Sequence, residues 1–244
     1  MNLEWIGCSA RNFRPGRPAG MRPEAIVIHV IVGSLASADS WFNDPVASVS
    51  AHYGVGRGGA VHQYVKEEDT AFHAGIVVNP TASLVLSRPK VNPNFYTIGI
   101  EHEGQPDDDW TSEQGVASSA LIANIAARWS IPIDSDHVIG HHTVRASKPC
   151  PGDLAKVAEL IAQAKSAPLA PGAGFATAVR TISNVRLRRG FPNTAAPVVK
   201  IIPAGTLLTP TGSVTGESIA ENAKWFRDAD GNFLWAGGTD APGL

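Results

Sequence analysis

Cysteines, charged residues and long apolar runs are all scarce in this chain of 244 residues. Its two cysteines cannot build a disulfide framework, although a single bridge between Cys8 and Cys150 stays open. No stretch is apolar over the length that a membrane crossing requires, and residues 1–20 lack the apolar core of a signal peptide. We therefore expect a protein made in the cytoplasm without a signal peptide and without membrane insertion.

Charge is also limited in amount and balanced in sign. Charged residues make up 17% of the sequence, and the formal net charge is -2. A partner held through phosphate contacts would need a basic surface, so we expect no nucleic-acid partner. A hydrophobic content of 43% is that of an ordinary globular protein, and the length suits one medium domain and one small domain.

The first strong element is a near-continuous, β-branched apolar run at residues 24–32. Such a run is typical of a strand that is buried on both faces. His29 interrupts it, and a buried imidazole must satisfy two ring nitrogens. Either a hydrogen bond in the core or a metal ion could do so.

The next segments surround that strand. Residues 34–43 start like a helix and carry Trp41 and Phe42, which we expect in the core. Residues 50–56 and 60–65 alternate around a glycine-rich turn, which predicts a hairpin. His73 sits in a loop of small residues at 70–75, where it could contact a ligand or be exposed and idle. Residues 77–94 have no clean period and predict a long surface loop beside a cleft.

A second strand is predicted at residues 96–104. Its period of two places Thr97, Gly99 and Glu101 on one face, while Ile98, Ile100 and His102 face the other way. A carboxylate beside a glycine, which opens space above the chain, suits a general base. A solvated strand edge is the alternative interpretation of Glu101.

Two predicted helices, at residues 112–129 and 153–165, enclose the richest motif of the chain, VIGHHTVRASKPCPGD at 138–153. It delivers His141 and His142, then Cys150 between two prolines, with Lys148 two positions earlier. Thiolate and imidazole are ligands that Zn²⁺ prefers, and a third ligand from elsewhere would leave one position for water. A hydrolytic site requires such an open position.

A boundary follows this motif. Residues 166–176 are rich in proline, alanine and glycine, the composition of a linker, so we expect a domain at 1–165 and another at 177–244. Beyond the linker, short strands are predicted at 185–188, 198–202, 207–209 and 224–226, with no helix signal. Together they suggest a small all-β barrel.

In their order along the chain, these motifs resemble the amidase-2 family of zinc-dependent N-acetylmuramoyl-L-alanine amidases, which is related to peptidoglycan recognition proteins. The resemblance covers residues 24–165. It is carried by the strand that ends at His29, the Ser50-Ala51-His52-Tyr53 strand, the His73-Ala74-Gly75 loop, Asn94 before Ile98-Gly99-Ile100-Glu101, and His142 through Cys150-Pro151-Gly152. It implies an α/β fold with a mixed central β-sheet flanked by helices. Residues 177–244 resemble a bacterial SH3-like domain of cell-wall hydrolases.

The resemblance also implies roles for particular residues. His29, His142 and Cys150 would bind Zn²⁺, His142 being preferred to His141 because its spacing to Cys150 matches the family. Glu101 would be the general base, and Lys148 the cation near the developing oxyanion.

Three further residues are expected at the substrate. His73 and Asn94 are candidates for holding the stem peptide. Ala51 stands where some relatives carry a catalytic tyrosine, so Tyr53 on the same strand face is the candidate replacement.

The implied activity is hydrolysis of the amide between N-acetylmuramic acid and L-alanine in peptidoglycan. We expect a monomeric phage endolysin or bacterial autolysin that reaches the wall after lysis or through a holin. The alternative is a non-catalytic peptidoglycan-binding protein, because relatives without the cysteine bind without cutting. Cys150 and Lys148 favour the enzyme.

Overall fold

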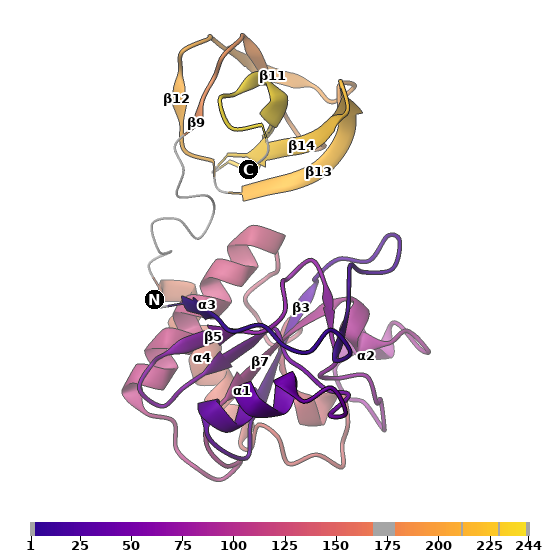
Figure 1. The fold of residues 1–244 in the computed structure, drawn as a ribbon, viewed down its shortest axis with the longest axis vertical. Helices are drawn as coiled ribbons and strands as arrows, with labels where there is room; N and C mark the ends of the chain where they lie inside the picture. The colour runs from indigo at the N-terminus through magenta and orange to yellow at the C-terminus, as the bar shows by residue number, and fades with distance from the viewer. Residues whose placement is uncertain (1–2, 168–178, 211, 229, 243–244) are drawn as a thin grey trace. The chain divides into compact units, whose positions relative to one another are not determined.

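The computed structural model of the protein describes residues 3–167, 179–210, 212–228 and 230–242 (Figure 1). It comprises two compact units, Met1–Pro168 and Leu169–Leu244. The predicted linker at 166–176 lies outside the described residues from position 168 onward, so its character stays a prediction. None of the described helices combines the length and hydropathy of a bilayer crossing.

A six-stranded mixed sheet, of which β3, β5 and β7 are labelled in Figure 1, forms the centre of the first unit. Its strand order is β1-β5-β4-β7-β3-β8. The strands are β1 (Leu3–Trp5), β3 (Ala25–Val30), β4 (Tyr53–Val55), β5 (Val61–Gln63), β7 (Thr97–His102) and β8 (Val138–Gly140). Strands β4 and β5 pair antiparallel, which confirms the predicted hairpin, and every other neighbouring pair is parallel. A small antiparallel pair, β2 (Phe13–Arg14) and β6 (Thr70–Ala71), lies outside this sheet.

Strand β3 is buried along its whole length, as its apolar run predicts. Ile26 and Ile28 belong to a core with helices α3 (Ser112–Trp129) and α4 (Leu154–Ser166). Val27 points to the opposite face, into a smaller core with Ala74 and Val85. Because side chains alternate along a strand, His29 shares the face of Val27 and emerges where β3 ends. The mixed sheet with helices on it agrees with the expected fold.

Two local expectations are corrected. The predicted loop at 77–94 contains a short helix, α2 (Ser83–Leu86), and a 3-10 turn, η1 (Pro93–Phe95). Helix α2 buries Val85 in the smaller core. In α1 (Leu35–Asn43), Phe42 is buried as expected, but Trp41 is 54% exposed, because adjacent helical residues point in different directions.

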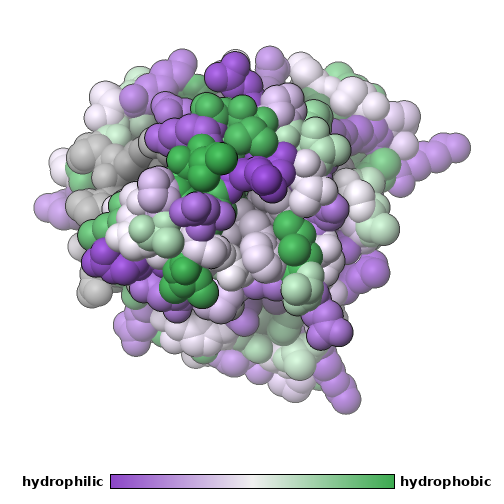
Figure 2. Space-filling view, turned by 90° about the horizontal axis from the view of Figure 1, so that it is seen from above, coloured by the Kyte–Doolittle hydropathy of each residue, from purple (hydrophilic) through white to green (hydrophobic). Residues whose placement is uncertain are grey.

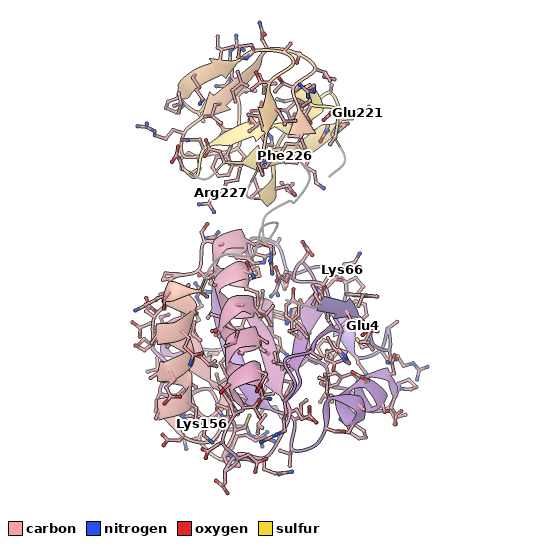
Figure 3. All side chains as sticks on the ribbon, turned by 90° about the vertical axis from the view of Figure 1, so that its left-hand side faces the viewer. Glu4, Lys66, Lys156, Glu221, Phe226 and Arg227 are labelled. Atoms are coloured by element: carbon pink, nitrogen blue, oxygen red, sulfur yellow. The ribbon has the colours of Figure 1, made fainter. Side chains whose placement is uncertain are left out.

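The loop that follows β7 is tied to helix α4. Lys156, labelled in Figure 3, donates from Nζ to the backbone oxygens of Pro106 and Asp108 at 3.3 and 2.5 Å. The adjacent β8 leads into a 3-10 turn, η2 (His141–Thr143), and then into the loop that carries Cys150. These contacts help to hold the residues around the carboxyl ends of β3, β7 and β8.

The second unit is built from short strands around its own core. A five-stranded sheet has the order β11-β10-β15-β14-β13, and β12 pairs with β9. The elements are β9 (Val179–Arg180), β10 (Val185–Arg188), β11 (Val198–Ile202), β12 (Leu207–Leu208), β13 (Gly212–Ile219), β14 (Asn222–Arg227), β15 (Phe233–Trp235) and a 3-10 turn, η3 (Ala236–Gly238). Phe226, labelled in Figure 3, is fully buried in this core. Strand β13 escaped prediction because its polar and glycine residues give little strand signal; antiparallel pairing with β14 forms it.

The outer surface of this unit keeps several apolar side chains in solvent, including Phe191, Val199 and Ile201. In the face seen in Figure 2, hydrophobic groups are interspersed among hydrophilic ones. The observed sheets agree with the expected all-β character, and an SH3-like barrel stays a prediction.

Candidate active site and metal centre

The ends of three parallel strands bring the candidate site together. In the register of the sheet, His29 on β3 lies opposite Glu101 on β7. Ile28 pairs with Gly140, the last residue of β8, so His141 follows beside His29. The carboxyl ends of parallel strands share one edge of a sheet, which is where such folds place ligands. His29 and His141, which are 112 positions apart in the sequence, therefore lie side by side.

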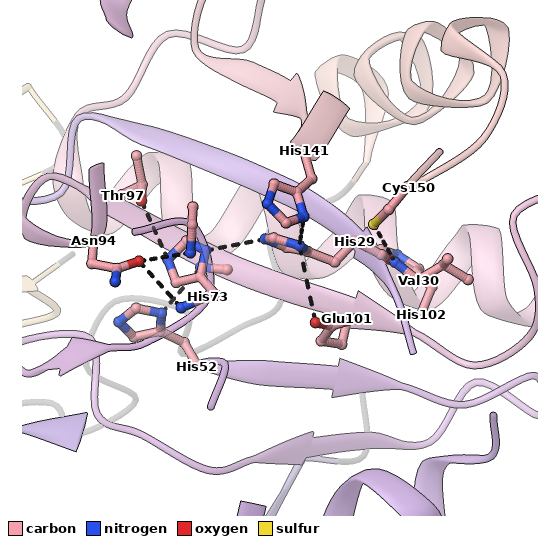
Figure 4. A network of polar contacts seen from close by, with 12 residues as sticks. His29, Val30, His52, His73, Asn94, Thr97, Glu101, His102, His141 and Cys150 are labelled. Atoms are coloured by element: carbon pink, nitrogen blue, oxygen red, sulfur yellow. Dashed lines mark hydrogen bonds and ion pairs between the residues drawn. The ribbon is translucent and has the colours of Figure 1, made fainter. Parts of the chain in front are cut away.

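A thiol completes this arrangement. His29, His141 and Cys150 each offer a ligand atom, and these atoms all lie within 4.8 Å of one another (Figure 4). His29 Nδ1 is 3.0 Å from His141 Nδ1. The backbone amide of Val30 donates to Cys150 Sγ at 3.1 Å, which fixes the thiol beside β3. Cys8 and Cys150 are free thiols, so the bridge between them is absent.

The structure places His141 in this cluster, whereas His142 was expected there. The backbone amide of His142 donates to the Cys150 oxygen at 2.9 Å, and its ring Nδ1 lies 3.1 Å from the same oxygen. The ring folds back over Gly140, where an added Cβ would lie 2.8 Å from His142 Cε1. Sequence spacing counts residues along the chain, whereas the turn after β8 decides which of two adjacent side chains points inward.

The protonation chemistry of the cluster fits a divalent cation. Burial lowers the pKa of His141 to about 4 and that of His29 well below its usual value, so both imidazoles are neutral, as metal ligands must be. Burial, with a smaller effect of Glu101, raises the pKa of Cys150 to about 12. A buried thiol becomes a thiolate when a cation compensates its charge. The donor set is the one that Zn²⁺ prefers.

Glu101 is not a solvated strand residue. Its side chain is 16% exposed, and Oε1 lies 4.0 Å from His29 Nδ1. Its Oε2 atom is buried and has no hydrogen-bond partner among the described residues. Burial raises the pKa of Glu101 to about 8, and the charge of Lys148 opposes this shift. A carboxyl group with a pKa near neutrality can both accept and return a proton.

A cavity of about 660 Å³ gives access to these groups. Its lining includes His29, Glu101, His141, Lys148 and Cys150. Apolar side chains also line it, among them Val32, Trp41 and Val49. Trp41, expected in the core, is instead exposed and lines this cavity. The cavity thus brings together the ammonium group of Lys148, the carboxyl group of Glu101 and the three candidate metal ligands.

Each ring nitrogen of His73 contacts another side chain of the protein. Its Nδ1 lies 3.1 Å from His29 Nε2, and its Nε2 lies 3.2 Å from Thr97 Oγ1 (Figure 4). It reaches the cavity wall, but both nitrogens have protein partners. Asn94 is 4% exposed, and its Oδ1 accepts from the amides of His73 and Ala74. That side chain holds the loop of His73 rather than facing the cavity.

Tyr53, expected at the substrate, lies outside the lining of the cavity that holds the candidate metal ligands. Only 2% of it is exposed, and its hydroxyl donates to Glu67 Oε1 at 2.7 Å. The same carboxylate pairs with Arg128 and accepts from Trp129 Nε1 at 2.6 Å. Tyr53 therefore belongs to a buried polar cluster beside α3, because its strand places it on the helix-covered face with Ile100.

A second cavity, of about 430 Å³, lies beside the segment that includes α2. Its lining includes Gly75, Val85, Arg88, Lys90 and Asn92. This location agrees with the expected cleft beside residues 77–94, although that segment is partly helical.

Known proteins share both the sequence pattern and the fold. N-acetylmuramoyl-L-alanine amidase A of Achromobacter lyticus is 35% identical over 127 residues, which are 51% of this chain and 61% of that protein. The 1,6-anhydro-N-acetylmuramyl-L-alanine amidase AmpD of Haemophilus influenzae is 34% identical over 93 residues, which are 38% of this chain and 46% of that protein. The chain thus spans less than two thirds of the length of either relative.

Among solved structures, the crystal structure of a selenomethionine AmpD derivative matches with a TM-score of 0.52 at 24% identity. The match covers 66% of this chain and 94% of that one, and it shows a shared fold. Residues 19–153 match the family Amidase_2, described as N-acetylmuramoyl-L-alanine amidase. Since this match takes in more than half of the sequence, the chain belongs to the Amidase_2 family.

Proposed function

We propose that this protein is a zinc-dependent N-acetylmuramoyl-L-alanine amidase that hydrolyses the amide between N-acetylmuramic acid and the L-alanine of the stem peptide in peptidoglycan. The observation that carries the proposal is the convergence of His29, His141 and Cys150 beside Glu101 in one open cavity. Membership of the family and the names of both relatives support this choice of bond.

In this proposal His29, His141 and Cys150 hold the metal. The chemistry that bound Zn²⁺ supplies is Lewis-acid polarisation of the scissile carbonyl and of the attacking water. Glu101 removes a proton from that water and returns it to the nitrogen of the leaving L-alanine, so that one water is consumed for each amide cleaved. Its buried position, with Oε2 unpartnered among the described residues, supports this role.

Lys148 supplies positive charge on the exposed side of the same cavity. In the proposed reaction it stabilises the oxygen on which negative charge develops as the carbonyl is attacked. The apolar side chains of Trp41 and Val32, which also line the cavity, would contact the uncharged parts of the substrate.

A peptidoglycan-binding protein without catalysis is the alternative. The thiol of Cys150 argues against it, because binding a glycan or a peptide needs no buried sulfur beside two imidazoles. We further propose that residues 177–244 form an SH3-like domain that binds the cell wall. The chain would act as a monomeric endolysin or autolysin. An endolysin would reach the wall after lysis or through a holin.

Digestion of purified peptidoglycan tests the proposal. Mass analysis should find stem peptides with a free N-terminal L-alanine and glycan chains with free lactyl carboxyl groups. The digestion should stop when a chelator removes zinc and resume when zinc is restored. Release of reducing sugars without free L-alanine would show a different bond to be cut.

A further inference from the structure

The ring of His29 is held at both nitrogens, and the partners beyond it determine where its proton sits. We infer that Thr97 and His73 form a relay that keeps the proton of His29 on Nε2 and leaves the lone pair of Nδ1 directed at the metal position. The inference rests on the proposed metal centre and assigns to His73 a positioning role rather than a contact with the stem peptide.

The relay starts at a backbone oxygen, which can only accept hydrogen bonds. Thr97 Oγ1 lies 2.7 Å from the carbonyl oxygen of Pro93, so the single hydroxyl proton of Thr97 must be donated there. The same Oγ1 lies 3.2 Å from His73 Nε2. Since the hydroxyl has no second proton, His73 Nε2 must carry the N–H of this contact.

The next contact transfers this constraint to His29. A neutral imidazole carries one N–H, so His73 Nδ1 is an acceptor once Nε2 is the donor. His29 Nε2 lies 3.1 Å from His73 Nδ1 and must therefore donate to it (Figure 4). His29 Nδ1 is then unprotonated, and this atom is the one that lies 3.0 Å from His141 Nδ1.

Packing makes the relay rigid. Gly99 lies beneath the His73 ring, where an added Cβ would be 2.5 Å from His73 Cγ. On the other side, His102 Nδ1 donates to the backbone oxygen of His29 at 2.9 Å, and His102 Nε2 accepts from Ser118 at 2.7 Å. His29 is thus positioned through its backbone by one histidine and through its ring by another.

Thr97 and His73 act on the candidate metal centre from outside it. They orient the ring of His29 without being ligands themselves. Outer partners that orient a ligating imidazole in this way typically change metal affinity by about 10–100-fold when removed.

The first test is made on the full-length, metal-free protein labelled with ¹⁵N in histidine. Long-range proton–nitrogen spectra should show the proton of His29 on Nε2 and that of His73 on Nε2. A proton on His29 Nδ1 would overturn the inference. This readout needs neither zinc nor activity, so it is separate from the test of the proposed function.

The second test compares Thr→Val variants by competition with a zinc chelator. Thr97→Val should weaken zinc binding by about 10–100-fold, and Thr97→Ser should restore it. Thr70→Val is the matched control, because Thr70 is fully buried and bonds the oxygen of Gly16 through its hydroxyl. If Thr97→Val binds zinc as tightly as Thr70→Val does, the relay is wrong. A wild-type protein that binds no zinc would instead refute the proposed function.

Discussion

The backbone amide of Val30 donates to Cys150 Sγ at 3.1 Å, which ties a loop thiol to the strand that carries His29 one residue earlier. This contact joins Val30 and Cys150, which are 120 positions apart in the sequence. A thiolate gains from this donor once a cation is present, and without a cation burial keeps the thiol protonated. The loop and the strand end act together as the candidate metal centre.

The two adjacent histidines should differ in their effect on zinc. His141→Ala removes an imidazole from the cluster, so zinc content measured by atomic absorption should fall to a small fraction of one per chain. His142→Ala leaves the three donors in place and is the matched control. Loss of zinc in His142→Ala with retention in His141→Ala would reverse the ligand assignment.

Gly99→Ala should disturb the site without altering any polar group. The added methyl would lie 2.5 Å from His73 Cγ, so the ring must shift away from His29 and Thr97. We expect a loss of about 1–3 kcal/mol in the free energy of unfolding, measured in urea, together with weaker zinc binding. Gly58→Ala is the control, because an added Cβ there meets nothing within 4 Å. Equal stability of the two variants would contradict the packing argument.

The cluster around Glu67 should matter for stability and not for chemistry. Glu67→Ala leaves Arg128 without its buried carboxylate partner, and removal of one partner of a buried pair typically costs about 3–5 kcal/mol. Tyr53→Phe removes one hydrogen bond to the same carboxylate and should cost about 1 kcal/mol. Activity per folded molecule should be unchanged in Tyr53→Phe. A large fall in kcat would show that Tyr53 takes part in the reaction.

The sequence alone predicted the elements that carry the site better than the directions of their side chains. The apolar run before His29 and the glycine beside Glu101 indicate local structure, and the structure confirms both strands. The choice between His141 and His142 depends on one turn after β8, and the burial of Tyr53 depends on which face α3 covers. Neither is encoded in spacing or periodicity, because both follow from long-range packing.

The role of His73 illustrates the same limit. Small neighbours in its loop favour contact with a ligand, whereas its partners, His29 and Thr97, come from the strands β3 and β7. A histidine in a loop and a threonine that shares a strand face with the candidate base give no local signal of a relay. In the register of β3 and β7, Thr97 lies opposite Ala25, four residues before His29, and the His73 ring contacts both Thr97 and His29.

The second unit should serve attachment to the wall. Each unit has its own hydrophobic core, so a chain that ends at residue 167 should fold. We expect this shorter chain to cleave soluble muropeptides at the rate of the full chain while it binds whole cell walls more weakly in a pull-down assay. Equal wall binding by both chains would remove the targeting role.

The most direct test of the account is kcat for Glu101→Gln on a soluble muropeptide, measured with zinc content determined on the same sample. Glutamine keeps the shape of the side chain but cannot take a proton from water, so kcat should fall by about 10²–10⁴-fold while the metal stays bound. Lys148→Ala in the same assay should also lower kcat, and the double variant should lose less than the product of the two effects. A fully zinc-loaded Glu101→Gln protein with near-normal kcat would contradict the central claim that the Glu101 carboxylate moves the proton.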